Sequence, residues 1–367
     1  MKHSSYLEWY IQVPKVQYDF RSSGVTRFKC DLALAEIDLS INYARGNPKT
    51  SELLAQRYHV QPESVFISSE GASGQNTRII RYIAETNERK NEAIVEYPTY
   101  EPLLRKVQEH FPRVKRLERE PKEAYSLNAD ALADKVSDRT GLLVLTNPHA
   151  PSGAISGKRE LEEIMTIAHE HEFPVLCDEI YAEFDRDTVP TIFSISPELG
   201  IVATSFTKAY GLGGLKLGVA LARENLVDGL YTDVLNTVGN SPNIVQLIAA
   251  KLLTKGGEKL DKHKQKWMDL RRAAEEWLSE KRLEYFPNKT GVTFWVDLPI
   301  KDTYKWINQQ AIPRYGVAAV PGTLFLFRHG HKLMKSNKIR LGLGNINPHR
   351  LSLAEAFEAL EKALDIK

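Results

Sequence analysis

Short apolar runs alternate with amphipathic stretches between about residues 43 and 223. The apolar runs are rich in Val, Ile and Leu and predict buried strands at residues 65–68, 93–96, 142–146, 175–178, 201–205 and 217–222. The stretches between them have a helical period and predict helices at residues 74–86, 102–110 and 161–170. Strands and helices in this order predict an α/β fold, with a mostly parallel sheet and helices on both faces.

After residue 255 the pattern changes. A charged segment at residues 258–282 predicts one long helix with a solvated face. Short strands are expected at residues 292–298, 317–320 and 339–343, and further helices at residues 304–312 and 353–364. We therefore expect a large domain at residues 41–255 and a smaller α+β domain made of residues 1–40 and 256–367.

The charge balance and the cysteine content restrict the possible partners. The 367 residues include 49 Lys and Arg against 47 Asp and Glu, which argues against nucleic acid or an acidic membrane surface as a partner. Cys30 and Cys177 are far apart and lack metal-ligand spacing, so we expect no metal site and a reducing, cytoplasmic location. No apolar stretch reaches the length of a membrane span.

The most informative motif is SFTKAYGLGGLKLG at residues 205–218, which follows an apolar run. A lysine at the end of a buried strand, as Lys208 is here, can have a shifted pKa and form a Schiff base. Ser205, Thr207 and Lys216 supply the hydroxyls and the charge that hold a phosphate. Pyridoxal 5'-phosphate (PLP), a carbonyl cofactor that carries a phosphate, uses both features. The alternative is a glycine-rich loop with surface lysines.

Other candidate residues also follow predicted strands, where ligands bind in open α/β sheets. Gly71, Ala72 and Ser73 open a helix whose free backbone N–H groups can bind an anion, although an ordinary βα turn looks the same. Asp178 ends an apolar strand, where a carboxylate is costly unless it is paired, for example with a pyridine N–H; the alternative is a solvated turn. Tyr181 could donate its phenol to a cofactor oxygen.

Three further segments complete the set. Tyr100 could stack on a flat heterocycle or pack in the core. The loop TNPHAPSG at residues 146–153 is shaped by two prolines, and a lone His149 there is more often a loop residue than a catalyst. Arg340 lies inside an apolar strand and predicts a carboxylate partner, from a substrate or from the protein. Together, the order and the chemistry of these segments predict one PLP site.

From about residue 43 to residue 344, this order of motifs resembles the fold-type I PLP enzymes, specifically the class I/II aminotransferases related to aspartate aminotransferase. The resemblance implies that Lys208 binds PLP as a Schiff base and moves the substrate proton. It also implies that Asp178 keeps the pyridine nitrogen protonated and that Tyr181 contacts the phenolic oxygen. Finally, it implies that Arg340 binds the substrate α-carboxylate.

The resemblance extends to the rest of the cofactor site. Tyr100 is expected to stack on the ring, and the phosphate is expected to be held by Gly71, Ala72, Ser73, Ser205, Thr207 and Lys216. Tyr43 matches the tyrosine that reaches the phosphate of a neighbouring subunit, so the resemblance also implies a homodimer with a shared site.

Two departures from the family pattern change the expectation. Ala150 stands where the family has an asparagine that donates to the phenolic oxygen, so the pKa of the Schiff base should be higher than in relatives. Asn147, three residues earlier, is kept as a candidate cofactor contact. Lys216 replaces the usual phosphate arginine, which keeps the charge but loses the bidentate fork and implies weaker cofactor binding.

The expected activity is transfer of an amino group between an amino acid and a 2-oxo acid, with an aspartate-aminotransferase-like specificity as one option. The alternatives are a PLP-dependent decarboxylase or lyase, an amino-acid-phosphate aminotransferase of the histidinol-phosphate type, and a catalytically impaired PLP-binding protein. A nucleotide-dependent oxidoreductase is disfavoured, because the glycines at 211, 213, 214 and 218 do not fit G-x-G-x-x-G.

Overall fold

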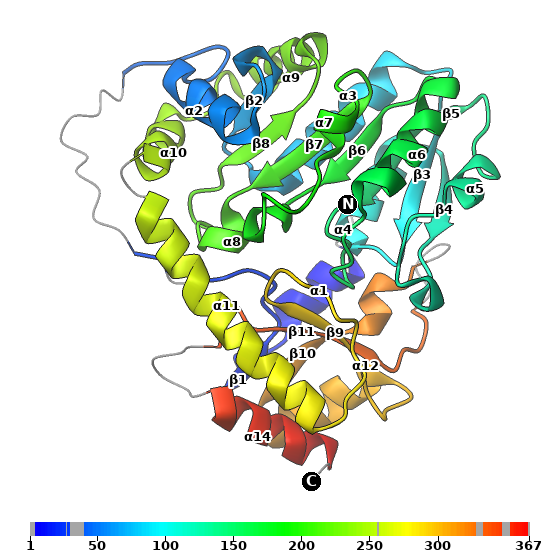
Figure 1. Cartoon of the computed structure of the whole chain (residues 1–367), viewed down its shortest axis with the longest axis vertical. Helices are drawn as coiled ribbons and strands as arrows, with labels where there is room; N and C mark the ends of the chain where they lie inside the picture. The colour runs from blue at the N-terminus through cyan, green and yellow to red at the C-terminus, as the bar shows by residue number, and fades with distance from the viewer. Residues whose placement is uncertain are drawn as a thin grey trace.

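A computed structural model describes residues 4–26, 28–29, 40–254, 257–327, 333–346 and 353–365. It contains a seven-stranded sheet and a four-stranded sheet (Figure 1). In the view of Figure 1, the large sheet and its helices form the upper part of the molecule and the small sheet lies below them. Cys177 is buried and free, and Cys30 lies outside the described residues.

The large sheet is mostly parallel, as the sequence pattern predicts. Its strands are β2 (Val65–Ser68), β3 (Glu92–Tyr97), β4 (Arg113–Glu118), β5 (Thr140–Thr146), β6 (Val175–Asp178), β7 (Gly200–Ser205) and β8 (Gly218–Leu221), in the order β2-β8-β7-β6-β5-β3-β4. Strand β8 is antiparallel to both of its neighbours, and the other pairings are parallel. Every residue of β3, β5, β6 and β7 is buried, which explains their continuous apolar runs.

Helices cover both faces of this sheet, which confirms the predicted fold class. One face packs against α3 (Gly71–Thr86), α4 (Glu101–His110) and α9 (Glu224–Val238). The other packs against α2 (Pro48–Tyr58), α6 (Lys158–Glu170) and α7 (Ile192–Ile195). Successive buried residues of a strand contribute to opposite cores, as Leu142 and Leu143 of β5 do.

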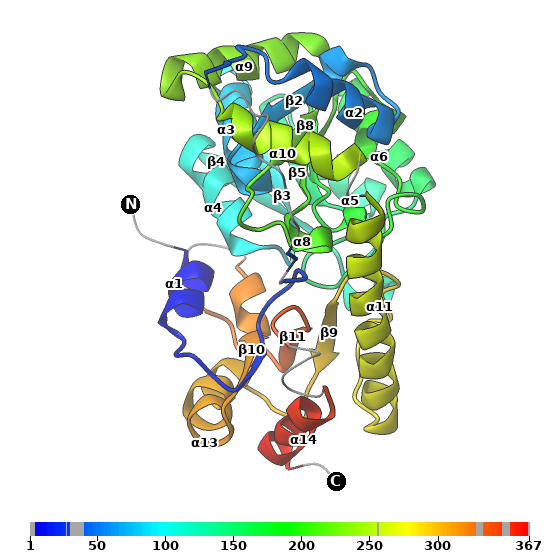
Figure 2. The ribbon, with the colours of Figure 1, turned by 90° about the vertical axis from the view of Figure 1, so that its left-hand side faces the viewer.

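The small sheet contains both early and late parts of the chain. Its strands are β1 (Tyr18–Phe20), β9 (Thr293–Asp297), β10 (Val317–Pro321) and β11 (Lys338–Gly342), in the order β1-β10-β11-β9. The first strand pairs in parallel with β10. The surrounding helices are α1 (Ser5–Gln12), α11 (Gly257–Glu280) and α14 (Leu353–Leu364), whereas α10 (Asn243–Thr254) packs against α2 in the upper part of the molecule (Figure 1). In Figure 2, α11 runs alongside both parts of the molecule.

Helices α1, α2, α9 and α10 were not expected from the sequence, and two strands and one further helix also differ from the expectation. Strand β4 has the sequence RVKRLE and lies at the edge of the large sheet, where charged side chains reach solvent and hide the strand pattern. The three-residue β1 is too short to give a pattern. The helix expected at residues 304–312 is divided into α12 (Thr303–Trp306), a π-helical turn (Ile307–Ala311) and α13 (Ile312–Tyr315), since a proline near the start of α13 lacks an N–H.

The fold brings the carboxyl ends of β6 and β7 next to the small sheet. The short helix α8 (Thr207–Tyr210) follows β7 and lies between the two parts of the molecule (Figures 1 and 2). The described residues contain no helix with both the length and the apolar character needed to cross a membrane.

Candidate active site

A pocket between the two sheets collects most of the residues singled out from the sequence. Those that line it are Ala72, Ser73, Tyr100, Asp178, Tyr181, Lys208 and Arg340. They come from the start of α3, the start of α4, the end of β6, α8 and the small-sheet strand β11. The pocket thus lies at the carboxyl ends of the parallel strands, where open α/β sheets bind ligands.

Lys208 is half-buried just after this strand end, with its amine inside the pocket. Its Nζ donates a hydrogen bond to the Ser23 hydroxyl at 3.1 Å, and burial lowers the pKa of its amine below the ordinary value. A lower pKa leaves a larger share of the amine neutral, which is the form that attacks a carbonyl and accepts a proton.

Asp178 ends β6 as a buried carboxylate held from both sides. Asn76 Nδ2 donates to Oδ2 at 2.6 Å, and the backbone N–H of Ile180 donates to Oδ1 at 3.1 Å. Burial raises the pKa of Asp178, and these two hydrogen bonds and the nearby Lys208 oppose the rise. A ligand N–H would add the ion pair that no described residue forms with this carboxylate.

Arg340 reaches the pocket from the small sheet. One terminal nitrogen, Nη2, donates to the Tyr6 hydroxyl and to the Arg21 carbonyl, each at 2.8 Å. The buried Nε has no hydrogen-bond partner among the described residues. Arg340 forms no ion pair with a described carboxylate, so its donors can receive one from a ligand.

Aromatic rings form a further wall. The rings of Tyr100 and Tyr6 meet edge to face, with centroids 5.0 Å apart, and burial raises the pKa of the Tyr100 phenol. Tyr181 lines the same pocket. These rings offer flat surfaces and hydroxyls to a heterocycle.

The start of α3 forms the other end of the pocket. Gly71 has φ +65°, a left-handed conformation that favours glycine, and its N–H donates to the Lys216 carbonyl at 2.7 Å. Ala72 and Ser73 follow in the first turn of this 16-residue helix, whose N–H groups and dipole favour an anion. Lys216 is exposed nearby, so charge and amide donors occur together.

Besides Gly71 and Lys216, which lie next to the pocket, four sequence candidates do not line it. Ser205 is fully buried and accepts a hydrogen bond from the Thr207 N–H at 3.2 Å, which joins these two candidates to each other. The Asn147 amide is used within the protein: it accepts from Ser156 N–H and donates to the carbonyls of Ser156 and Pro190. We therefore correct the expectation for Asn147, because no donor of its side chain is left for a cofactor. Tyr43 is half-buried and is not among the lining residues.

Several pocket residues were missed by the sequence analysis. They are Tyr6, Ser23, Thr146 and Ile180, together with Asn76, which holds Asp178 from behind. Asn76 could have been suspected, because it lies one helical turn after Ala72 on the same helix. Tyr6 and Ser23 carry no local signal, since they reach the site through the pairing of β1 with β10.

Ala150 lies where two pockets meet. It lines the pocket of Lys208 and also a narrower one shared with Tyr181, Arg340, Thr290 and His149. Its backbone N–H donates to the Thr146 hydroxyl at 2.8 Å, and its methyl group offers no donor. Next to it, the buried His149 ring contacts Ser152 Oγ at 2.7 Å and the Pro98 carbonyl at 3.0 Å, which supports its reading as a loop residue.

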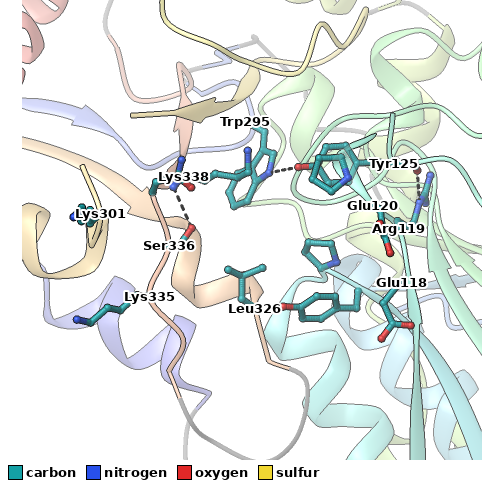
Figure 3. Close-up of a pocket in the computed structure, with 14 residues that line it drawn as sticks. Glu118, Arg119, Glu120, Tyr125, Trp295, Lys301, Leu326, Lys335, Ser336 and Lys338 are labelled. Atoms are coloured by element: carbon teal, nitrogen blue, oxygen red, sulfur yellow. Dashed lines mark hydrogen bonds between the residues drawn. The ribbon is translucent and has the colours of Figure 1, made fainter. Parts of the chain in front are cut away.

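A separate, larger hollow lies between the segment after β4 and the edge of the small sheet (Figure 3). Across it, the Trp295 indole N–H donates to the Tyr125 hydroxyl at 2.9 Å. Lys338 forms an ion pair with Asp297, and Arg119 donates to the Tyr125 carbonyl at 2.6 Å. None of the sequence candidates lines this hollow, so we keep the pocket of Lys208 as the candidate active site.

The residues of the Lys208 pocket fit PLP. Lys208 offers an amine in the pocket for the aldehyde, and Asp178 offers a buried carboxylate for the ring nitrogen. The start of α3 and Lys216 offer donors and charge for the phosphate. The unpartnered Arg340 Nε remains for the carboxylate of a substrate. Each chemical group of the cofactor therefore has a matching group in this chain.

Comparison with known proteins gives the same result. The model of the family "Aminotransferase class I and II" matches residues 37–352. "Aromatic-amino-acid aminotransferase 2" of Thermococcus litoralis is 28% identical over 66% of this chain and 60% of its own. "Aspartate aminotransferase" of Pyrococcus abyssi is 27% identical over 66% of this chain and 60% of its own. The chain thus spans about 60% of the length of these two relatives.

The fold has solved counterparts as well. The crystal structure of a PLP-dependent aminotransferase from Streptococcus suis matches with a TM-score of 0.83 and 22% identity, over 100% of this chain and 98% of that one. This likeness supports the fold, and the family match extends over most of the sequence, including the Lys208 motif and the Arg340 strand. The chain belongs to the aminotransferase class I and II family, a family of PLP-dependent enzymes.

Proposed function

We propose that this chain is a PLP-dependent aminotransferase that moves an amino group between an amino acid and a 2-oxo acid. The observation that supports it most strongly is the meeting of Lys208, Asp178 and Arg340 in one pocket, although they come from different elements. These residues supply an amine, a carboxylate and a guanidinium, which are the groups that this reaction requires.

Bound PLP supplies an electron sink for the carbon that loses its proton. The chain's own residues would hold the cofactor, transfer the proton and orient the substrate. Asp178, fixed by Asn76 and Ile180, keeps the ring nitrogen of the cofactor protonated by pairing with its N–H. Lys208, with its lowered pKa, takes up and returns the substrate proton at Nζ. Arg340 orients the α-carboxylate through its free donor.

The decisive test is chemical. The protein is loaded with PLP, reduced with borohydride and digested, and the modified peptide is identified by mass spectrometry. We expect modification at Lys208 and none after Lys208→Ala, while Lys216 serves as the internal control because it lies on the exposed side of the same motif. An unmodified Lys208 would refute the proposal.

Substrate and reaction are assigned by a second experiment. Each amino acid is mixed with the PLP-loaded protein, and the change of cofactor absorbance is followed with and without a 2-oxo acid. Repeated turnover by transamination requires the acceptor, which restores the absorbance of PLP, whereas decarboxylation or elimination turns over without it. The two relatives named above act, by their names, on aromatic amino acids and on aspartate, so both donor classes belong in the screen.

We also propose that two chains associate through the end of α9. Leu235 and Val238 are exposed there, and Ile41 is exposed on the segment that the Asn243 side chain ties to α10. This segment contains Tyr43, the residue that would reach a neighbouring phosphate. An exposed apolar group of this kind favours a protein partner.

Light scattering tests the association. We expect the mass of two chains for the wild type and of one chain for Val238→Asp. Ile11→Asp is the control, because Ile11 is 71% exposed on α1 and lies outside the proposed interface. A single-chain mass for the wild type would contradict the dimer.

The cytoplasmic location stays a prediction from the sequence.

A further inference from the structure

The segment that follows β1 passes directly over Lys208. Lys208 Nζ donates a hydrogen bond to Ser23 Oγ at 3.1 Å, and Ser23 is 5% exposed. It is the one hydrogen bond that Nζ makes within the described part of the chain. Ser23 is 185 positions away from Lys208 in the sequence, so only the small-domain segment brings this hydroxyl to the amine.

The backbone around Ser23 is fixed on both sides. The Val25 N–H donates to the Lys208 carbonyl at 2.8 Å. Gly24 lies so close that a Cβ atom there would be 2.6 Å from Lys208 Cδ and 2.8 Å from Lys208 Cα. On the other side, the Gly344 N–H donates to the Ser22 carbonyl at 3.2 Å. Ser23 therefore has a defined position relative to Nζ.

Charged and titratable groups from four parts of the chain act on Lys208. Tyr6 approaches from α1, Arg340 from β11, Asp178 from β6, and Lys216 from the segment after α8. Two of them are cations that disfavour the protonated amine, and Asp178 favours it. Ser23 adds a neutral acceptor that directs the amine without adding charge.

We propose that Ser23 is a positioning residue for the proton transfer by Lys208. The proposal rests on the function proposed above. While the amine is free, Ser23 Oγ accepts one N–H, so the nitrogen lone pair keeps a fixed direction into the pocket. When Lys208 takes the substrate proton, an N–H bond forms at Nζ, the electron pair of the broken C–H bond stays with the substrate, and Ser23 stabilises the resulting ammonium. Ser23 itself neither gains nor loses a proton.

The first test measures the amine without the cofactor. In cofactor-free protein, the pKa of Lys208 is obtained from the pH dependence of trace acetylation, read by mass spectrometry. We expect Ser23→Ala to lower this pKa by about one unit, because an acceptor for the charged amine is lost. Ser22→Ala is the matched control, since the Ser22 hydroxyl donates to the Gly24 carbonyl at 2.8 Å and not to Lys208. Ser23→Thr, which keeps the hydroxyl, should restore the wild-type value.

The second test uses the PLP-loaded protein. We expect Ser23→Ala to lower kcat about tenfold with little change in KM, and to shift the pH profile of kcat in the same direction as the amine pKa. Equal effects of Ser22→Ala and Ser23→Ala, or an unchanged pKa after Ser23→Ala, would overturn the proposal. Borohydride mapping of the same samples distinguishes failure of the Ser23 proposal from failure of the proposed function. The pKa of the Lys208 amine can be measured whether or not PLP reacts with it, so the role of Ser23 is tested in either case.

Discussion

At the scale of single residues, the loop around Ala150 shows how one side chain can alter a site without altering the fold. Ala150 lines the Lys208 pocket together with Tyr181 and Arg340. Its methyl group leaves this position without a hydrogen-bond donor, while its backbone N–H is held by Thr146. The electrostatic consequence should therefore be visible in the bound cofactor rather than in stability.

Ala150→Asn should lower the pH at which the absorbance of bound PLP titrates, by about one unit. The new amide can donate to the cofactor's phenolic oxygen and so stabilise its ionised form. The measurement is an absorbance titration of the PLP-loaded protein. Ala150→Val fills a similar space without a donor and is expected to leave the titration in place. An unchanged or raised value for Ala150→Asn would contradict the prediction.

His149, the preceding residue, provides a pH-dependent element of stability. It is buried and hydrogen-bonded to the Pro98 carbonyl, and burial holds its pKa well below its ordinary value of 6.5. The unfolded chain therefore binds a proton that the folded chain excludes, so the contribution of His149 is present above pH 6.5 and is lost as the pH falls below it.

We expect the unfolding free energy to fall by about 2 kcal/mol when the pH is lowered from 6.5 to 5. The reason is that one proton excluded from the folded chain contributes about 1.4 kcal/mol per pH unit. Urea unfolding of cofactor-free protein at several pH values measures the slope. His149→Gln should be less stable but less dependent on pH, whereas the exposed His171→Gln should keep the wild-type slope. If His149→Gln is not folded, NMR titration of the His149 ring should show no protonation down to pH 5.

At the scale of secondary-structure elements, Arg57 joins three of them behind the pocket. It lies at the end of α2 and donates to Glu183 Oε2 and to the Tyr210 hydroxyl, each at 2.7 Å. Its guanidinium also lies over the rings of Phe206 and Tyr210, at 5.3 and 5.7 Å from their centroids. These two rings flank Lys208 by two positions on either side, so Arg57 braces the turn that carries the lysine.

Arg57→Ala should lower the unfolding free energy by about 3 kcal/mol, because it leaves the fully buried Glu183 carboxylate without its cation. Chemical denaturation measures this loss. The control is Lys49→Ala on the same helix, where the exposed ion pair with Glu52 contributes about 0.5 kcal/mol or less. If both substitutions had the same small effect, the bracing role of Arg57 would be wrong.

At the scale of the whole molecule, the pocket joins the two sheets. Lys208 and Asp178 come from the large sheet, Arg340 and Ser23 from the small sheet and the segment after β1. A ligand that contacts both groups is bound by the folded chain and not by the unfolded one, so it stabilises the whole fold.

PLP should therefore raise the thermal unfolding midpoint. At one hundred times its dissociation constant a ligand contributes about 2.7 kcal/mol, which corresponds to several degrees for a chain of this size. Differential scanning calorimetry of cofactor-free and PLP-loaded protein measures the shift. Lys208→Ala should show a smaller shift, because it can bind PLP only without the covalent link. No shift in the wild type would contradict the assignment of the pocket.

Local sequence was enough to predict most of the large sheet and the chemistry of its strand ends. Strands buried on both faces give continuous apolar runs, as β5 and β6 do, and the residue that ends each run is expected at one edge of the sheet. Asp178 and Lys208 could be chosen in this way, and Arg340 because it lies inside an apolar strand, since an ionisable group in or next to an apolar run is costly without a function or a partner. The edge strand β4, with one solvated side, gave no such signal.

Long-range packing decided the rest. The Asn147 amide bonds to backbone groups of Ser156 and Pro190, so its neighbours in the fold and not its place in the motif decide its role. Tyr6 and Ser23 reach the pocket because β1 pairs with β10, which places the start of the chain over residues more than a hundred positions away. Such contacts depend on how separate elements pack against each other, and the periodicity of a short segment carries no information about them.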